Sequence, residues 1–163
     1  MLGMSEQLRT EFIDAMAQYP SGVTIVTATD PDGAPVGFTA SSFCSVSVDP
    51  PLVLVCLART ANCFPVFAVA ESFAVSVLGA EQTELAFRFA TKRPDKFAGD
   101  DFVTTAAGAV VVRDSPVRLE CAVRSRVEAG DHTILVGAVE AVSQARHLRP
   151  AIYVDRGFID TWS

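Results

Sequence analysis

The chain has 163 residues, of which 50% are hydrophobic and 20% are charged, a composition typical of one globular domain. Its formal net charge is −6 and it has no cluster of lysine and arginine, so the sequence disfavours binding to nucleic acid or to an anionic membrane. The richest apolar run, PLVLVCLA (51–58), is much shorter than the roughly 20 residues that a membrane-spanning helix needs.

The first predicted element is an amphipathic helix over residues 5–19. The segment MLGMSEQLRTEF carries charge too early for a secretory signal, so we expect a cytoplasmic protein. Ser5 is a suitable N-cap, and Pro20 and Gly22 end the helix. We expect its apolar face to pack on the rest of the domain. That face consists of Leu8, Phe12, Ala15, Met16 and Tyr19.

The next segments alternate between extended and helical patterns. The β-branched residues 23–29 predict a strand, DPDG (30–33) predicts a turn, and residues 35–48 predict a further extended segment closed by two prolines. The continuous apolar run LVLVCLA (52–58) predicts a strand buried on both faces. The remaining patterns predict a helix at 60–71, a strand at 72–79, a helix at 80–92 and a loop at 93–102.

The second half of the chain predicts antiparallel strands. Residues 117–129 and 132–145 alternate or run apolar, and the dipeptide GD separates them, which indicates a hairpin. The last segment, AIYVDRGFIDTW, predicts two short strands around Arg156 and Gly157. Six to eight strands and about three helices, without regular βαβ alternation, favour a mainly β fold. We expect an antiparallel barrel with peripheral helices, forming a single domain over residues 1–163.

Several common catalytic and binding motifs are missing. The glycines never form GxGxxG, and the sequence has no P-loop and no GxSxG segment. With only two histidines, His132 and His147, both a Ser-His-Asp triad and a metal site are disfavoured. We expect the cysteines to be small, buried side chains in a reducing compartment. They are Cys44, Cys56, Cys63 and Cys121.

The segment GFTASSFCSVSVDPP (37–51) resembles a strand but carries many small hydroxyls. Short hydroxyls and exposed backbone N–H groups can meet the polar atoms of a flat heterocycle, or a phosphate, without filling the space that the ligand needs. On composition alone, an edge strand whose hydroxyls face water is the favoured alternative.

Six segments follow one another in a recognisable order: YPSGVTIVTA, GFTASSFCSVSVDPPLVLVCL, FAVSVL, DKFAG, LEC and GDHTILVGAVEAV. Over residues 12–158 this order resembles the flavin reductase domain family, the small reductase components of two-component flavin-dependent monooxygenases. The segment CLARTANCFPVF is similar to members that serve aromatic polyketide antibiotic biosynthesis in actinomycetes. The resemblance implies a split β-barrel of the Greek-key, FMN-binding type.

The resemblance also implies an activity, an NAD(P)H:flavin oxidoreductase. Hydride passes from NADH or NADPH to FMN or FAD, which is a dissociable substrate bound at a homodimer interface, and the reduced flavin diffuses to a partner monooxygenase. A non-catalytic split-barrel protein that binds flavin or haem for storage or sensing is the alternative, and the GDH segment favours the enzyme. A pure interaction subunit is disfavoured, because an interface core prefers aromatic anchors to hydroxyls.

The resemblance assigns flavin contacts to two stretches. The first lines the ring and ribityl chain, with Ser45 and Ser47 on one face by the period of a strand. It comprises Phe38, Thr39, Ala40, Ser41, Ser42, Ser45, Val46 and Ser47. The second ends strand 52–58 and begins the following helix, where we expect the flavin phosphate. It comprises Leu57, Ala58, Arg59, Thr60, Ala61 and Asn62. Ordinary N-capping by Thr60 or Asn62 is the alternative.

Further single residues complete the expected site. Lys96 provides a cation for the phosphate or is a solvated loop lysine, and Phe97 covers the adenine or the flavin ring. The resemblance places His132 of the GDH segment near the nicotinamide, where we expect it to orient the ring by position, because hydride transfer needs alignment more than acid–base help. A structural histidine at the hairpin corner is the alternative. Tyr153 and Arg156 border the pocket, or else pack in the core or at a dimer contact. We expect Cys44 and Cys63 to fill space near the site.

Overall fold

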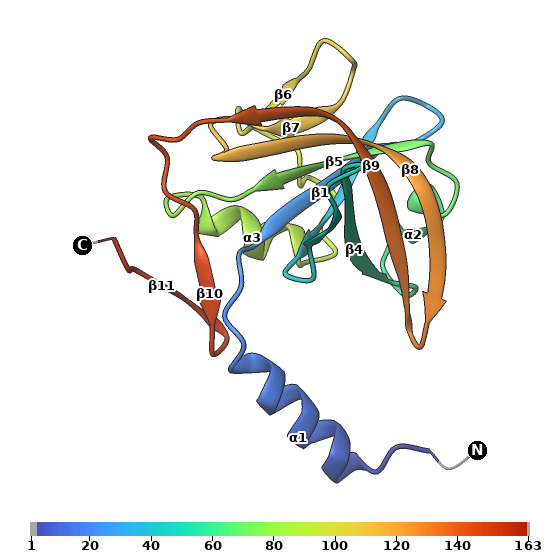
Figure 1. Cartoon of the computed structure of the whole chain (residues 1–163), viewed down its shortest axis with the longest axis vertical. Helices are drawn as coiled ribbons and strands as arrows, with labels where there is room; N and C mark the ends of the chain where they lie inside the picture. The colour runs from blue at the N-terminus through green and yellow to red at the C-terminus, as the bar shows by residue number, and fades with distance from the viewer. Residues whose placement is uncertain (1–2, 163) are drawn as a thin grey trace.

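The computed structural model describes residues 3–162, with three helices and eleven strands in that range (Figure 1). The helices are α1 (Glu6–Ala17), α2 (Phe64–Phe67) and α3 (Thr83–Phe89). The main sheet contains β1 (Thr24–Thr29), β2 (Pro35–Ala40), β3 (Cys44–Ser47), β4 (Leu52–Ala58), β5 (Ser72–Val77), β8 (Val117–Ala129) and β9 (His132–Gln144). Two separate pairs are β6 (Phe102–Thr104) with β7 (Val110–Val112), and β10 (Ile152–Val154) with β11 (Gly157–Ile159). Among these residues, none of the helices has the length and apolar character to cross a membrane.

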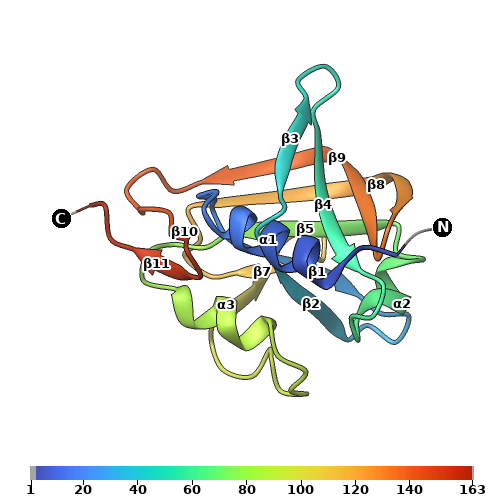
Figure 2. The same cartoon turned by 90° about the horizontal axis from the view of Figure 1, so that it is seen from below.

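The main sheet is antiparallel, with the strand order β2-β1-β5-β8-β9-β4-β3 (Figure 2). Its two edge strands, β2 and β3, are consecutive in the chain, and only residues 41–43 separate them. Seven strands laid flat would place the edges about 29 Å apart. The connection between β2 and β3 reaches at most about 14 Å. The sheet therefore curls until β2 comes into contact with β4. The predicted extended segment 35–48 is thus two strands, one at each edge.

The β8–β9 hairpin is the longest paired element of the barrel. Its register runs from Val117 opposite Gln144 to Ala129 opposite His132, which confirms the predicted hairpin. Gly130 takes the left-handed conformation that the tight turn requires, with φ of 61°. Two bulges, at residues 120–121 and 123–125, add twist to the hairpin and help the sheet to curve.

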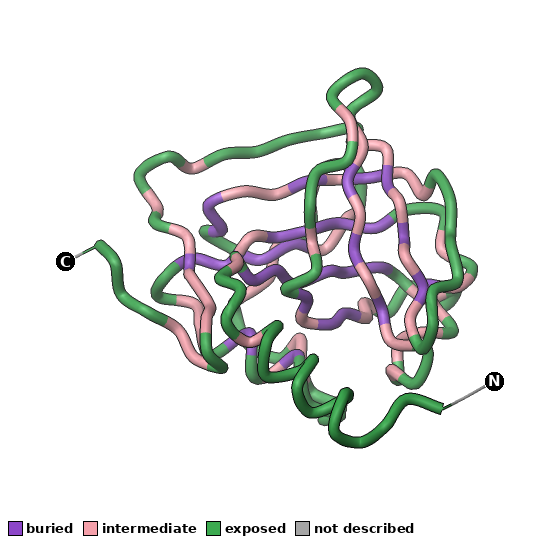
Figure 3. Tube along the Cα trace, turned by 60° about the horizontal axis from the view of Figure 1, so that its bottom comes forward, coloured by how far each residue is buried: buried purple, intermediate pink, exposed green. Residues whose placement is uncertain are grey.

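Buried residues alternate with more exposed ones along strands of the barrel, as the colours of Figure 3 show. In β4, Val53, Val55 and Leu57 are buried, whereas Leu54 and Cys56 remain half-buried on the outer face. The prediction that this strand is buried on both faces was therefore wrong, because one face of a curled sheet points outward. Buried side chains from β1, β2, β4, β5, β8, β9 and α2 form this core: Val26, Phe38, Val53, Val55, Leu57, Phe67, Phe73, Val75, Leu119 and Leu135.

A second apolar cluster lies between the sheet and α3. Phe89 of α3 is its centre, and the Phe97 ring packs edge-on against it with centroids 5.0 Å apart. Arg88 fixes the helix by bonding Glu84 at 2.8 Å and Asp101 at 3.0 Å. The β6–β7 hairpin was not predicted, although it begins at the last residue of the expected loop 93–102 and buries two of its valines, Val111 and Val112.

Helix α1 differs from the expectation that it packs on the barrel. It begins after Ser5, whose Oγ accepts a hydrogen bond from the Leu8 amide, but none of its residues is buried. The Asp155 amide donates to the Ala17 carbonyl at 2.7 Å, and Arg156 pairs with Asp14. These contacts attach one end of α1 to the β10–β11 turn, and the helix extends away from the barrel (Figure 1). Its apolar face therefore has no partner among residues 3–162.

The close packing around Gly137 of β9 yields a stability prediction. A Cβ at this position would lie 2.5 Å from Phe73 Cζ and 2.9 Å from Cys121 Cβ, closer than such atoms approach. We expect Gly137→Ala to lower the free energy of unfolding by about 1–3 kcal/mol, as overpacked cores do. Urea denaturation measures this change. Gly157→Ala is the matched control, because a Cβ there meets open space. Equal midpoints for the two variants would contradict the packing described here.

Candidate functional site

Strand β4 is paired with β9 along its whole length on one side. On its other side, no strand within residues 3–162 covers its C-terminal half. Strand β3 pairs with β4 only as far as Cys44 opposite Leu54. Two residues further along β4, at Cys56, the Ser42 hydroxyl forms the hydrogen bonds that a neighbouring strand would otherwise form. Its Oγ accepts a hydrogen bond from the Cys56 amide at 2.9 Å and donates to the Cys56 carbonyl at 3.4 Å. The edge beyond Cys56 therefore opens between the β2–β3 connection and the residues that follow β4.

The turn at residues 59–62 directly follows this open edge. The Ala61 amide donates to the Ala58 carbonyl at 3.1 Å, which closes the turn. Among the described residues, neither the amides nor the exposed side chains of Thr60 and Asn62 have a hydrogen-bond partner. The predicted helix at 60–71 is only the four-residue α2, which begins at Phe64. The expected helix start at Thr60 was therefore wrong, whereas the phosphate site at residues 59–62 stays a prediction in which the turn itself offers the donors.

His132 lies beside this turn because β4 and β9 are paired. Ala58, the last residue of β4, is directly opposite His132, the first residue of β9, so both point to the outer face. The His132 Nδ1 atom lies 2.7 Å from Asp131 Oδ1. This hydrogen bond holds the pKa of the Asp131 carboxyl below its usual range. The ring is 44% exposed, and only its Nε2 atom is left for a ligand.

Arg59 connects the two segments. Its amide donates to the Asp131 carbonyl at 3.1 Å, and its guanidinium donates to the Gly130 carbonyl. The sequence-based expectation made Arg59 a flavin contact, and its contacts in the structure are to the β8–β9 turn instead. No local sequence signal indicates this role, because the partner residues are about 70 positions away.

Lys96 also lies near the turn. Burial lowers the pKa of its ammonium group, and the nearby Cys63 thiol partly offsets this effect. Its Nζ donates to the Phe89 carbonyl at 3.2 Å. The neighbouring Phe97 ring packs against Phe89 and Phe102, with centroids 5.0 and 4.7 Å away. The half-buried Phe97 therefore packs on the α3 cluster, and its expected place over a ligand ring stays a prediction.

The hydroxyl-rich stretch serves both the interior and the surface. The Thr39 hydroxyl donates to the Ala86 carbonyl of α3 at 2.6 Å, and the Phe38 ring is buried against Phe67. Their side chains therefore point to opposite faces of β2, Thr39 toward α3 and Phe38 into the barrel interior. Ala40 is also buried. In contrast, Ser41 and Ser42 are exposed at the β2–β3 connection.

Strand periodicity had predicted that the side chains of Ser45 and Ser47 share a face. In the structure they do not. Ser45 is opposite Val53 and Ser47 is opposite Leu52, with Val46 as an extra bulged residue between them. Because Val53 and Leu52 point to opposite faces of β4, the two serines do so as well. Val46 is half exposed at 50%. A bulge of this kind depends on the partner strand and leaves no mark in the hydroxyl pattern.

Tyr153 and Arg156 lie away from the turn at 59–62. The Tyr153 ring packs edge-on against Phe158 at 5.2 Å, and its backbone pairs with Ser21. Arg156 contacts Asp14 of α1. Core packing and a contact to α1 therefore account for both residues, and the structure does not bring either of them together with His132.

The cysteines differ in exposure. Cys44 is exposed on edge strand β3, so its expected burial was wrong, whereas burial raises the pKa of the Cys121 thiol to about 12. Burial also raises the pKa of Cys63. A thiol with a raised pKa stays protonated near neutral pH and is a poor nucleophile. Cys63 and Cys121 are thus packing residues, as the sequence suggested.

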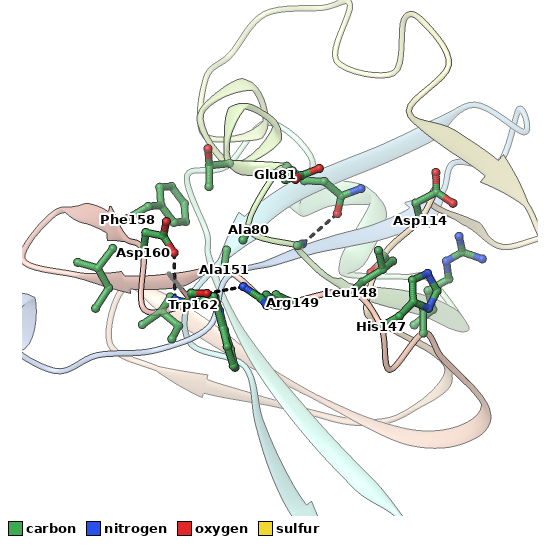
Figure 4. A pocket seen from close by; sticks show the side chains of 18 of the residues that line it. Ala80, Glu81, Asp114, His147, Leu148, Arg149, Ala151, Phe158, Asp160 and Trp162 are labelled. Atoms are coloured by element: carbon green, nitrogen blue, oxygen red, sulfur yellow. Dashed lines mark hydrogen bonds between the residues drawn. The ribbon is translucent and has the colours of Figure 1, made fainter.

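A larger cavity of about 990 Å³ lies at another part of the molecule (Figure 4). Its walls come from residues 79–83, from the start of β8 and from the C-terminal segment, where Arg149 donates to the Trp162 carbonyl. None of the predicted flavin or nicotinamide contacts lines this cavity. A smaller cavity of about 190 Å³ is lined by Leu57, Arg126 and Thr133, among others, and lies close to the predicted site. The larger cavity is therefore not assigned to flavin or nicotinamide binding on its size alone.

Comparison with known proteins decides the family. The family profile of the flavin reductase like domain matches residues 16–161, nearly the whole chain. The chain belongs to the flavin reductase family. It is 58% identical to the actinorhodin polyketide dimerase of Streptomyces coelicolor over 89% of this chain and 82% of that protein. It is 37% identical to HsaB, the reductase subunit of a flavin-dependent monooxygenase of Rhodococcus jostii, over 87% of this chain and 72% of that subunit.

A solved flavin reductase confirms the fold. The structure of the NADH:FAD oxidoreductase SgcE6 of Streptomyces globisporus C-1027, in complex with NAD and FAD fragments, superposes with a TM-score of 0.89. The two sequences are 33% identical, and the match covers 98% of this chain and 96% of that one. The predicted split-barrel fold is therefore confirmed, and the protein is an oxidoreductase of the flavin reductase family.

Proposed function

We propose that this flavin reductase transfers a hydride from NADH to a dissociable flavin at the open edge of β4. The observation that carries the proposal is the pairing of Ala58 with His132, which puts the turn at residues 59–62 next to the only histidine of the GDH segment. The names of the relatives support a reductase over a non-catalytic flavin- or haem-binding protein.

The residues at the edge fit a flavin. The amides and side chains of Thr60 and Asn62, which have no hydrogen-bond partner among residues 3–162, are donors suited to a phosphate, and Lys96 adds a positive charge nearby. Small side chains, among them Ser41, Ser42 and Ala58, let the backbone approach a flat ring. When bound, the flavin supplies the ring that accepts a hydride. The exposure of the edge suits a ligand that leaves after each turnover.

His132 acts by position in this proposal. Its Nδ1 atom is committed to Asp131, so Nε2 is the atom that meets the nicotinamide. Hydride transfer requires the two rings to stack in a defined orientation, and a fixed imidazole at the rim limits how the nicotinamide lies. No proton transfer by His132 is needed for this role.

The physiological role is also part of the proposal, and the names of the relatives support it. The Rhodococcus jostii relative is named a reductase subunit of a monooxygenase, which supports delivery of reduced flavin to a partner monooxygenase. The similarity to a polyketide dimerase supports a place in antibiotic biosynthesis. We place the protein in the cytoplasm, where NADH is available and where its free cysteines stay reduced. We expect FMN to be preferred over FAD, because the donors of the short turn at residues 59–62 suit a single phosphate.

A homodimer is part of the proposal, because apolar surface is left uncovered in the single chain. Leu8, Phe12, Ile13 and Met16 of α1 are each 44–58% exposed. The outer face of the sheet also carries the half-buried Cys56 and Ile134 and the 49% exposed Val127. Exposed apolar areas of this kind mark interfaces. A second copy of the chain is the partner that would cover both copies of α1 at once.

The phosphate assignment gives the first functional prediction. Changing Thr60 and Asn62 together to Ala removes side-chain hydrogen bonds to a charged group, each worth about 1.5–3 kcal/mol. We therefore expect the Kd for FMN to rise at least about tenfold, while the Kd for riboflavin, which has no phosphate, changes little. Fluorescence titration measures both constants. Thr104→Ala, on the β6–β7 hairpin, is the control. An equal loss for FMN and riboflavin would move the phosphate elsewhere.

The role of His132 gives a second prediction. His132→Ala should lower kcat/KM for NADH by about tenfold to a hundredfold, equivalent to about 1.4–2.7 kcal/mol, and leave the Kd for FMN nearly unchanged. Stopped-flow reduction of FMN, beside a thermal melt of the same preparation, separates chemistry from stability. His147→Ala, which changes the histidine of the larger cavity, should behave like the wild type. Normal reduction kinetics with a lowered melting temperature would remove His132 from the site.

The dimer gives a third prediction. A double change of Phe12 and Met16 to Glu places charge on the apolar face of α1, which carries no buried residue in the single chain. We expect this variant to be monomeric by light scattering and to keep its β-sheet circular dichroism. Arg9→Glu changes the charge of the same helix to a similar extent and should leave the dimer intact. A wild-type protein that is monomeric at micromolar concentration would refute the proposed dimer.

A further inference from the structure

Arg59 makes contacts that reach from the end of β4 to the β8–β9 turn. Its amide donates to the Asp131 carbonyl at 3.1 Å, and its guanidinium donates to the Gly130 carbonyl. The guanidinium also lies 4.0 Å from the Glu128 carboxylate. All three partners belong to the hairpin end that immediately precedes His132. Arg59 itself belongs to the turn at 59–62, whose free amides are the proposed phosphate donors.

Of these contacts, the bond from the Arg59 guanidinium to the Gly130 carbonyl is the one that restrains the β8–β9 turn. A charge-assisted hydrogen bond is stronger than a neutral one. The contact with Glu128 is long, and its carboxylate is 84% exposed, so solvent screens that ion pair. Gly130 is the most permissive position of the turn, and every residue from 124 to 131 is exposed. The Arg126 bonds to the carbonyls of Phe67 and Ala70, and the pairing of β9 with β4 as far as His132, fix the hairpin on either side of its tip. The anchored carbonyl at Gly130 restricts the exposed tip itself.

We propose that Arg59 is a positioning residue that holds the β8–β9 turn and thereby sets the direction of the His132 ring. This inference rests on the proposed role of His132 in orienting the nicotinamide. It replaces the expectation that the Arg59 side chain binds the flavin. One residue then links the two half-sites, because its neighbours Thr60 and Asn62 meet the flavin phosphate while its own side chain fixes the turn next to the nicotinamide.

The test compares three variants. Arg59→Met keeps the length of the side chain and removes every donor. We expect it to lower kcat/KM for NADH about tenfold, since small displacements of a positioning group have effects of this size. The Kd for both FMN and riboflavin should stay close to that of the wild type. Arg59→Lys should restore part of the loss, because an ammonium group still donates to the carbonyl. Glu128→Gln, which weakens only the ion pair, should behave like the wild type.

A double-mutant cycle shows whether Arg59 acts through His132. If it does, Arg59→Met should cause little further loss of kcat/KM in the His132→Ala background, because the ring that it positions is already absent. Full additivity of the two losses would overturn the proposal. An unchanged kcat/KM for NADH in Arg59→Met alone would also overturn it. A raised Kd for FMN but not for riboflavin would overturn it as well, by making Arg59 a phosphate contact.

Hydrogen exchange tests whether Arg59 anchors the β8–β9 turn, independently of the role of His132. Amides at residues 129–133 should exchange faster in Arg59→Met than in the wild type or in Glu128→Gln, with the rest of the sheet unchanged. This result would support the anchoring of the turn even if His132→Ala left NADH kinetics normal, in which case the proposed role of His132 would fail alone. Unchanged exchange at 129–133 would overturn the anchoring role directly.

Discussion

Three residues, 41–43, connect two strands that lie at opposite edges of a seven-stranded sheet. This connection cannot bridge a flat sheet, because seven strands would separate the edges by about 29 Å. The curl of the sheet, the gap that remains between its edges and the position of the hydroxyl-rich segment all depend on it. The split of the barrel is thus a result of strand order and connection length, and the packed interior then stabilises the curl.

The same connection defines the site. Ser42 bonds both backbone groups of Cys56, so the segment between the edge strands is attached to β4 by a side chain and not by a strand ladder. The remaining edge of β4 stays open beside the turn at 59–62. Across β4, the pairing with β9 brings His132 to the same end. Residues about 70 positions apart in the chain thereby come together at the proposed site, with Arg59 as the contact between them.

Much of this arrangement could be predicted from local pattern. The β8–β9 hairpin was predicted almost to its ends, because alternation over thirteen-residue strands and the GD turn depend on nearby residues alone. Features that depend on a partner strand were missed or misjudged. The bulge at Val46 turns Ser45 and Ser47 to opposite faces, and α2 shrinks to four residues. The helix at 5–19 was recognised by its apolar face, but an amphipathic pattern does not say which molecule covers that face.

The location of the site is the central claim, because the molecule also has a larger cavity bordered by the C-terminal segment (Figure 4). Hydrogen exchange of the wild-type protein, alone and with saturating FMN and NAD⁺, tests it most directly. A site at the open edge of β4 predicts slower exchange at residues 41–47, 58–62 and 129–134, and no change around the larger cavity. Protection confined to residues 79–83 and 145–162, with none at 58–62, would contradict the site described here.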